Sequence, residues 1–268
     1  MTKAYENLHF LHSRDARTLR ILAEYLEPQA RFARYNVADT VVFFGSSRTL
    51  PPDEAQAQAT EARANGDPRR IEAADRGVAL SRYYDDARTL ARLLTDWSKG
   101  LRLPSRRFIV CSGGGPGIME AANRGASDAA GISVGLGISL PMEATSNPYI
   151  TRELTFEFHY FFMRKFWFVY LAKALAVFPG GFGTLDELFE LLTLTQTRKT
   201  GKRMPVVLFG REYWDEIIDF QALVRWGTIS ADDLDLFHVC DTPQEAFQYL
   251  QYELTHMYLG PTSDPTGE

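Results

Sequence analysis

The stretch AVFPGGFGTLDELFE, residues 176–190, joins an apolar run, a Pro-Gly-Gly turn and a helical pattern within one short span. Its first residues have the composition of a buried strand. After the glycines, Leu185, Leu188 and Leu192 recur at helical spacing. A strand that turns directly into a helix is typical of an α/β fold.

Four other apolar runs resemble the strand part of this junction. The five predicted strands cover residues 40–45, 107–113, 132–140, 174–180 and 205–210. Helical patterns separate or follow them at residues 117–130, 161–174, 184–198, 211–227 and 242–257. Continuous apolar runs are typical of strands covered on both faces. The alternation therefore predicts an α/β fold with a doubly wound parallel sheet flanked by helices.

Two regions lie outside this pattern. Residues 13–35 predict one amphipathic helix led by Ser13, with Leu19, Leu22 and Leu26 on a stripe that ends near Pro28. Residues 53–99 predict two helices joined by a turn at 65–68. We predict a helical extension over 1–39, one domain over 40–255 that contains this insertion, and a flexible tail over 256–268.

The composition excludes several classes of protein. The net charge of −5 over 268 residues argues against a general nucleic-acid binder. No segment reaches the ~20 apolar residues of a membrane span, and the first residues do not have the pattern of a signal peptide. Cys111 and Cys240 are expected to be reduced core residues, which favours the cytoplasm. The five histidines show no metal-ligand spacing, so no metal is predicted.

Three of the predicted strands end in glycine-containing loops. Gly45 and Ser46 follow the first strand, Gly113, Gly114 and Gly115 follow the second, and the Pro-Gly-Gly turn follows the fourth. Ligands of doubly wound sheets bind at the carboxyl ends of the strands. The loops match neither the dinucleotide fingerprint nor the Walker phosphate loop, which disfavours hydride transfer and ATP hydrolysis.

The quoted stretch offers the most specific candidates. Gly180, Gly181 and Gly183 would bring backbone N–H groups against a phosphate, and Thr184 would add a hydroxyl. Glu187 follows Thr184 by three residues, which is also the spacing of a capping box. One glycine would suffice for a cap, so three glycines favour a ligand.

Arg164 and Lys165 stand in an otherwise apolar helix. Charges on a buried helix are costly unless they are paired or functional. The alternative is that both side chains reach the surface along their aliphatic stems. Glu153, earlier in the same segment, could cap or pair locally.

The segments SGGGPGIMEAANRGA (112–126) and PGGFGTLDE (179–187) together resemble the LOG ("Lonely Guy") family, whose members are also described as possible lysine decarboxylases. The Pro-Gly-Gly-x-Gly-Thr-x-x-Glu signature is complete from Pro179 to Glu187. The Arg164–Lys165 pair matches the Arg-Lys pair of the family. The long chain, with its insertion, is similar to the longer bacterial members.

The resemblance implies a Rossmann-like homodimer, or a higher oligomer, that hydrolyses a nucleoside 5′-monophosphate to the base and ribose 5-phosphate without a cofactor. The base would be adenine or an N6-prenylated adenine, as in cytokinin biosynthesis. Carried over by position, Gly181, Gly183 and Thr184 hold the phosphate. Glu187 and Arg164 are the catalytic pair. The remaining substrate contacts implied are Glu153, Lys165 and Thr193.

Two alternatives stay open at this point. A nucleotide or molybdenum-cofactor carrier would need the glycine loops but not both Glu187 and Arg164, and a broader nucleotide nucleosidase would differ only in its base pocket. No lysine-cofactor motif supports decarboxylation. In the hydrolase hypothesis, Glu187 stabilises an oxocarbenium-like ribosyl cation, and Arg164 keeps Glu187 ionised by lowering its pKa.

Overall fold

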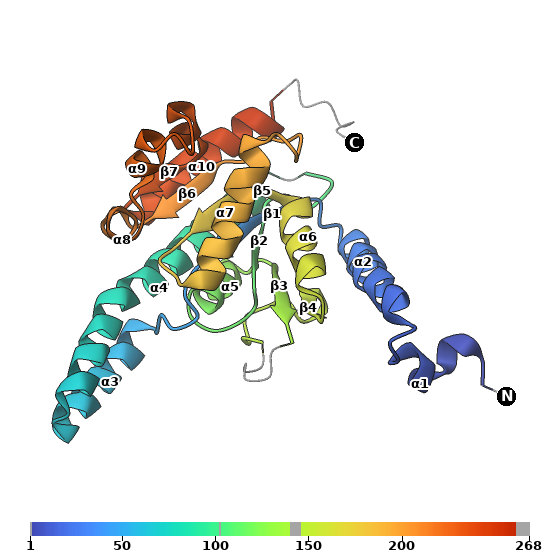
Figure 1. Cartoon of the computed structure of the whole chain (residues 1–268), viewed down its shortest axis with the longest axis horizontal. Helices are drawn as coiled ribbons and strands as arrows, with labels where there is room; N and C mark the ends of the chain where they lie inside the picture. The colour runs from blue at the N-terminus through green and yellow to red at the C-terminus, as the bar shows by residue number, and fades with distance from the viewer. Residues whose placement is uncertain (1, 102, 140–145, 261–268) are drawn as a thin grey trace.

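The computed structural model describes residues 2–101, 103–139 and 146–260. One sheet runs through this part of the chain in the order β4-β3-β2-β1-β5-β6-β7, and every neighbouring pair is parallel (Figure 1). The strands are β1 (Thr40–Phe44), β2 (Ile109–Ser112), β3 (Ser133–Ile138), β4 (Thr155–Phe158), β5 (Ala172–Val177), β6 (Val206–Phe209) and β7 (His238–Cys240). This is the predicted Rossmann-like, doubly wound α/β fold.

Helices cover both faces of the sheet. One face packs against α2 (Arg17–Arg34), α6 (Phe161–Leu171), α7 (Phe182–Gln196) and α8 (Arg211–Ile217). The other packs against α4 (Pro68–Gly100), α5 (Ile118–Asp128) and α10 (Pro243–Tyr258). Along β1, Val42 and Phe44 join the first core while Val41 and Phe43 join the second. The continuous apolar run of this strand thus serves two cores.

All five predicted strands are confirmed, with ends that differ by up to three residues from those expected. The last residue of the predicted strand 132–140 lies outside the described part. β4 and β7 were not predicted. They are the two edge strands, and each carries an exposed polar residue, Glu157 or His238, inside its short run. An edge strand faces solvent on one side, so its sequence lacks the continuous apolar run used to find the others.

The helical insertion has the predicted form. α3 (Pro52–Asn65) ends at Gly66, whose φ is +73°, and α4 begins after Asp67, whose side chain accepts a hydrogen bond from Arg69 N. Figure 1 shows α3 and the first half of α4 projecting from the sheet as a hairpin. Alanines 55, 59 and 62 of α3 are buried in it.

Two predicted helices differ from the structure. Residues 211–227 form α8 and α9 (Phe220–Arg225) rather than one helix, because the chain is extended at Ile218 and Asp219 starts a new helix by accepting a hydrogen bond from Ala222 N. Helix α10 extends to Tyr258, three residues into the predicted tail. Residues 261–268 of that tail lie outside the described part.

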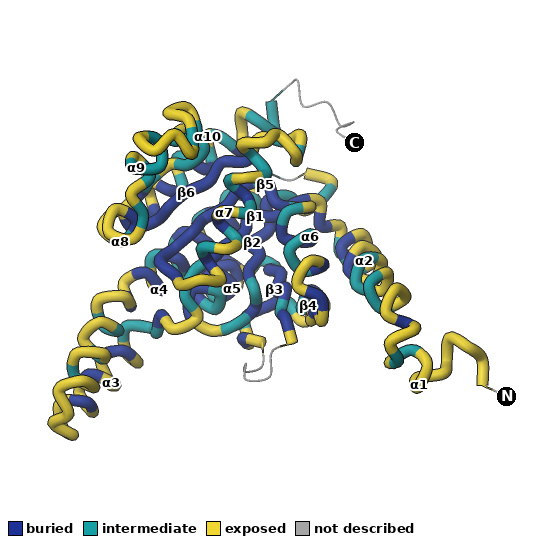
Figure 2. Tube along the Cα trace, viewed as in Figure 1, coloured by how far each residue is buried: buried dark blue, intermediate teal, exposed yellow. Residues whose placement is uncertain are grey.

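The N-terminal extension also departs from the prediction. Before α2 it contains two short turns, η1 (Ala4–Glu6) and α1 (Leu8–Leu11). Ser13 does not lead α2, and Pro28 lies buried inside α2 rather than at its end. The predicted stripe of Leu19, Leu22 and Leu26 is about half exposed. Figure 2 shows that α2 has both exposed and buried stretches along its length. Tyr25 and Phe32 pack instead against Trp167 of α6.

Candidate functional site

Most of the predicted site residues gather where the order of the strands in the parallel sheet reverses, between β1 and β5. β1 has β2 on one side and β5 on the other, and their connections cover opposite faces of the sheet. In this topology a crevice opens beyond the carboxyl ends of the strands at that point. Gly45 and Ser46 follow β1, Gly113 follows β2, and the Pro-Gly-Gly turn closely follows β5.

The loops after these three strands contact one another directly. Ser46 N donates to the carbonyl of Pro179 at 2.9 Å, and Ile118 N donates to the carbonyl of Ser46 at 3.1 Å. Gly117 has a φ of +71°, and a Cβ there would lie 2.3 Å from the carbonyl oxygen of Ser46. A Cβ on Gly45 would lie 2.7 Å from Ile118. These glycines allow the loops to meet.

The Gly113–Gly115 loop is fixed by a buried polar network. Ser112 Oγ donates to Asn123 Oδ1 at 2.7 Å, and Asn147 Nδ2 donates to the same oxygen at 3.0 Å. Asn147 Nδ2 also donates to the carbonyls of Gly114 and Gly115. Side chains at 113 and 115 would meet Met119, and Gly114 has a φ of +76°. Packing and backbone angle therefore account for this glycine run.

The glycines of the Pro-Gly-Gly-x-Gly motif fall into two kinds. A Cβ on Gly180 would lie 2.2 Å from Thr184 Oγ1, so Gly180 is required by close packing. Gly181 and Gly183 face open space, with nothing within 4 Å of a built Cβ, and neither has a positive φ. Neither the local packing nor the backbone angle calls for glycine at these two positions.

Helix α7 begins earlier than predicted, which removes the capping-box alternative. Its first residue is Phe182 and its N-cap is Gly181, with no side-chain cap in the described residues. Thr184 is therefore inside the first turn and buried rather than capping the helix. The N–H groups of an uncapped first turn are free to meet an anion.

Arg164 and Glu187 form a nearly buried charge pair in the candidate site. Arg164 Nη2 lies 3.1 Å from Glu187 Oε1, and the two side chains are only 14% and 12% exposed. Arg164 does not reach the surface, which was the alternative to a functional pair. Gly183 and Glu187 are four residues apart in α7 and share one helix face. The carboxylate thus stands on the same face as the open space beside Gly183.

The ionisation of Glu187 differs from the expectation. We expected Arg164 to lower its pKa, and Arg164 does act in that direction. Burial outweighs it, however, and raises the pKa of Glu187 from 4.5 to about 7. In this geometry, the free energy lost when the carboxylate is removed from water exceeds the free energy gained from its interaction with one guanidinium. Near neutral pH, both protonation states of Glu187 are therefore populated.

The guanidinium of Arg164 has unused binding capacity. Its Nε is buried and has no hydrogen-bond partner among the described residues. Its carbon lies 5.2 Å from the ring centroid of Phe161 and 5.6 Å from that of Phe168. An unpartnered buried donor costs free energy, and such groups are often found where a ligand is missing.

Helix α6, which carries Arg164, is held at both ends by charged side chains from elsewhere in the chain. At its start, Glu24 of α2 accepts hydrogen bonds from the N–H groups of His159 and Tyr160 at 2.8 and 3.2 Å. At its end, Lys202 Nζ donates to carbonyls of residues 169, 170 and 172. Both charges have the sign that stabilises their end of a helix. Sequence reasoning missed both residues, because their partners are distant in sequence.

A further missed residue holds the glycine motif. Tyr213 of α8 donates its hydroxyl hydrogen to the carbonyl of Gly180 at 2.5 Å. This bond fixes the turn that leads into α7. No local pattern around Tyr213 could have indicated this partner, which lies 33 residues away.

Three predicted contacts lie away from Glu187. Lys165 Nζ pairs with Asp186 and Glu190 of α7, each at 2.8 Å. Thr193 lies with Lys165 along a groove of about 500 Å³ beside α7. Glu153 is exposed in the turn before β4. It therefore lies at the amino ends of the strands, whereas Glu187 lies beyond their carboxyl ends. The structure does not bring Glu153 to the candidate site.

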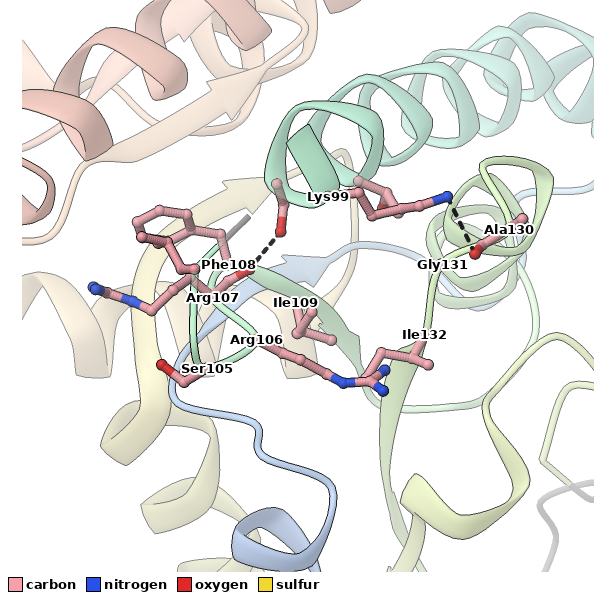
Figure 3. Close-up of a pocket in the computed structure, with 12 residues that line it drawn as sticks. Lys99, Ser105, Arg106, Arg107, Phe108, Ile109, Ala130, Gly131 and Ile132 are labelled. Atoms are coloured by element: carbon pink, nitrogen blue, oxygen red, sulfur yellow. Dashed lines mark hydrogen bonds between the residues drawn. The ribbon is translucent and has the colours of Figure 1, made fainter. Parts of the chain in front are cut away.

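A separate cavity of about 340 Å³ lies at the amino ends of the strands, before β2 and β3 (Figure 3). Lys99, Arg106 and Arg107 line it, and no carboxylate does among its described lining residues. Lys99 Nζ donates to the carbonyl of Ala130 at 3.3 Å, and Ser98 Oγ donates to that of Arg107 at 2.5 Å. None of the predicted site residues lines this cavity, so the candidate site is the one at the carboxyl ends of the strands.

A match to a known protein family covers part of the candidate site. Residues 119–250 match the family described as "Possible lysine decarboxylase". The match agrees with the resemblance of the motifs to the LOG family over this segment. The matched LOG segment includes Arg164 and the whole motif from Pro179 to Glu187, whereas β1, β2 and their glycine loops precede it. A search of the curated proteins found no match.

Several solved structures are similar over most of this chain. The structural-genomics target TM1055 has 22% identity and a TM-score of 0.49, covering 80% of this chain and 99% of its own. A molybdenum cofactor binding protein from Rippkaea orientalis has 16% identity and a TM-score of 0.49, covering 81% and 96%. A molybdenum cofactor carrier protein from Chlamydomonas reinhardtii has 17% identity and a TM-score of 0.45, covering 81% and 99%. At these identities and TM-scores, no conclusion about the ligand of this chain follows from the likeness.

Proposed function

We propose that this protein hydrolyses the N-glycosidic bond of a nucleoside 5′-monophosphate, AMP or an N6-modified AMP, to give the free base and ribose 5-phosphate. The observation that carries the proposal is the nearly buried Arg164–Glu187 pair beside the open, glycine-lined start of α7. A carrier would have no evident use for a carboxylate that the fold buries at a cost in free energy.

The phosphate would lie at the start of α7. The N–H groups of its uncapped first turn supply donors, and the helix dipole favours an anion there. The open space beside Gly181 and Gly183 allows phosphate oxygens to approach the main chain, which a side chain would prevent. Phosphate binding would therefore explain the glycines at positions 181 and 183, which packing does not require.

Glu187 would act on the sugar. When the C1′–N bond breaks, positive charge develops on the ribosyl ring, and the carboxylate form of Glu187 stabilises that charge. Water then forms the new bond to C1′, its proton leaves, and the departing base takes up a proton. Arg164 would hold Glu187 in place, and its free Nε would meet a substrate oxygen.

We also propose a homo-oligomer that uses the face around the site. Phe161, Phe162 and Tyr170 of α6 are about half exposed, and Phe182 at the start of α7 is 93% exposed. Aromatic side chains gathered on two neighbouring helices are typical of a protein interface.

None of the described helices is long and apolar enough to cross a bilayer. The two cysteines are free and buried, and we propose the cytoplasm as the compartment.

The experiment is a panel of purine and pyrimidine nucleoside 5′-monophosphates, including N6-modified AMP, assayed for ribose 5-phosphate release. We expect release from adenine nucleotides and a loss of at least about 100-fold in kcat for Glu187→Gln. Glu190→Gln is the matched control, because Glu190 is on the same helix but pairs with Lys165. Tight nucleotide binding without release from any member would contradict the proposal and favour a carrier.

A further inference from the structure

A second group of chemically active side chains lies at the far edge of the sheet, away from the candidate active site. His238 and Cys240 belong to edge strand β7, and Glu245 belongs to the first turn of α10. One ligand atom of each side chain lies within 4.8 Å of the others. In the described part of the chain, this is the one group of three such side chains that lie this close together. From this geometry we propose that His238, Cys240 and Glu245 bind a zinc-type divalent metal ion.

The local structure brings these three side chains together. His238 and Cys240 are two residues apart on a strand, so their side chains point to the same face of the sheet. That face is covered by α10, where Tyr249 stacks on His238 with ring centroids 4.4 Å apart. Glu245 is three residues after Thr242, the N-cap of α10. The turn between strand and helix therefore returns Glu245 to the end of β7.

Glu245 retains an oxygen for a metal. Its Oε2 accepts a hydrogen bond from Asp241 N at 3.2 Å, which fixes the side chain over the turn. Oε1 accepts no hydrogen bond from the described residues. One carboxylate oxygen is thus positioned by the backbone while the other remains free, an arrangement that suits a monodentate ligand.

The set of ligand types favours zinc. Thiolate, imidazole and carboxylate are its three usual protein ligands, whereas magnesium and calcium prefer oxygen alone. Tetrahedral zinc bonds of about 2.0–2.3 Å place neighbouring ligand atoms roughly 3.3–3.7 Å apart. The present group would have to contract by about 1 Å on binding, through small rotations of the exposed His238 and Glu245 side chains. A water would complete four-fold coordination.

Binding would displace one proton. Cys240 is a free, buried cysteine, and its thiol proton would pass to solvent as the metal–sulfur bond forms. The product would be a cross-link between the last strand of the sheet and the last helix. The site would therefore act on stability and not on nucleotide cleavage, and its existence does not depend on the proposed function.

The test uses the full-length chain without a polyhistidine tag, stripped of metal and titrated with Zn²⁺ and, separately, Co²⁺. We expect one ion per chain, a near-ultraviolet thiolate-to-cobalt absorption and a higher melting temperature with Zn²⁺. Cys240→Ser and His238→Ala should lose all three. Cys111→Ser is the matched control, because Cys111 is the other buried cysteine and belongs to no such group.

Two results would overturn the proposal. The first is a wild-type cobalt spectrum without the thiolate absorption. The second is Zn²⁺ binding that is equally strong in wild type and His238→Ala. His238 is exposed, so His238→Ala should fold even where Cys240→Ser does not. Glu245→Gln keeps an amide oxygen for the turn and should weaken Zn²⁺ binding at least tenfold.

Discussion

At the scale of single residues, the proposed chemistry depends on Glu187 and on the glycines that precede it. The sequence indicated both, because the motif from Pro179 to Glu187 places them together along the chain. It could not indicate the ionisation of Glu187. That depends on the burial of the carboxylate under neighbours that are distant in sequence, and burial outweighs the attraction of Arg164.

The pKa of Glu187 predicts a pH dependence. Because burial raises this pKa to about 7, the carboxylate form predominates above that value and is lost below it. If the carboxylate stabilises the ribosyl cation, kcat/KM should fall about tenfold per pH unit below pH 7 and level off above it. Initial rates with AMP between pH 5 and 9 measure this. A rate that rises on acidification would assign the protonated form of Glu187 instead.

The two open glycines predict opposite effects on stability and binding. Gly183→Ala meets no neighbour, so it should raise the free energy of unfolding by up to about 1 kcal/mol. The same methyl group would obstruct the phosphate and raise KM for AMP roughly tenfold, equivalent to the loss of one charged hydrogen bond. Denaturant unfolding and steady-state kinetics test the two effects. Unchanged KM would argue that the phosphate does not lie there.

Gly180→Ala is the contrasting variant. A Cβ at this position would lie 2.2 Å from Thr184 Oγ1 and 3.0 Å from Ser46 N, so the turn must shift. We expect a loss of stability of about 1–3 kcal/mol, typical of overpacking. Equal stability of Gly180→Ala and Gly183→Ala would contradict the distinction between packed and open glycines.

At the scale of elements, the N-terminal extension supports helix α6, which carries Arg164. Glu24 of α2 caps α6 through the N–H groups of His159 and Tyr160, and Trp167 Nε1 donates to the Glu24 carbonyl at 3.0 Å. Burial lowers the pKa of Lys202 to about 8, so at neutral pH it still donates to the far end of α6 as an ammonium group. These two charges hold the helix from which Arg164 reaches Glu187.

This arrangement predicts that Glu24→Ala affects both stability and activity. Two charge-assisted hydrogen bonds are lost, and the free energy of unfolding should fall by about 1–3 kcal/mol. Activity should fall as well, because the start of α6 and hence Arg164 are less well fixed. Glu27→Ala is the control, since Glu27 lies one turn further along α2 and, within the described ranges, pairs with Arg31 alone. Equal effects of the two variants would argue against the capping role.

The elements also show what the sequence could and could not predict. Central strands such as β1 and β6 are buried on both faces, and their apolar runs are evident in the sequence. The edge strands β4 and β7 are short and partly polar, and were missed for that reason. Leu19, Leu22 and Leu26 have helical spacing, but a pattern alone does not tell which side of α2 meets α6. Contacts such as that of Tyr213 with Gly180 become visible only when distant segments meet.

At the scale of the whole molecule, the exposed aromatic residues of α6 and α7 predict self-association. Light scattering should give a mass of at least two chains of 30.3 kDa each. Phe162→Asp should shift the protein to the monomer. Trp226→Asp should not, although Trp226 is more exposed, because it lies at the end of α9 and outside this face. A monomeric wild type would contradict the proposed assembly.

The central claim is that the start of α7 holds a monophosphate so that Glu187 faces the anomeric carbon of its ribose. A crystal structure of the Glu187→Gln variant with AMP tests this most directly, because the substrate should bind without being cleaved. We predict phosphate oxygens within hydrogen-bond distance of the backbone N–H groups of residues 182–184, with C1′ beside the side chain of residue 187. A nucleotide bound elsewhere, or with its ribose turned away from that side chain, would contradict the claim.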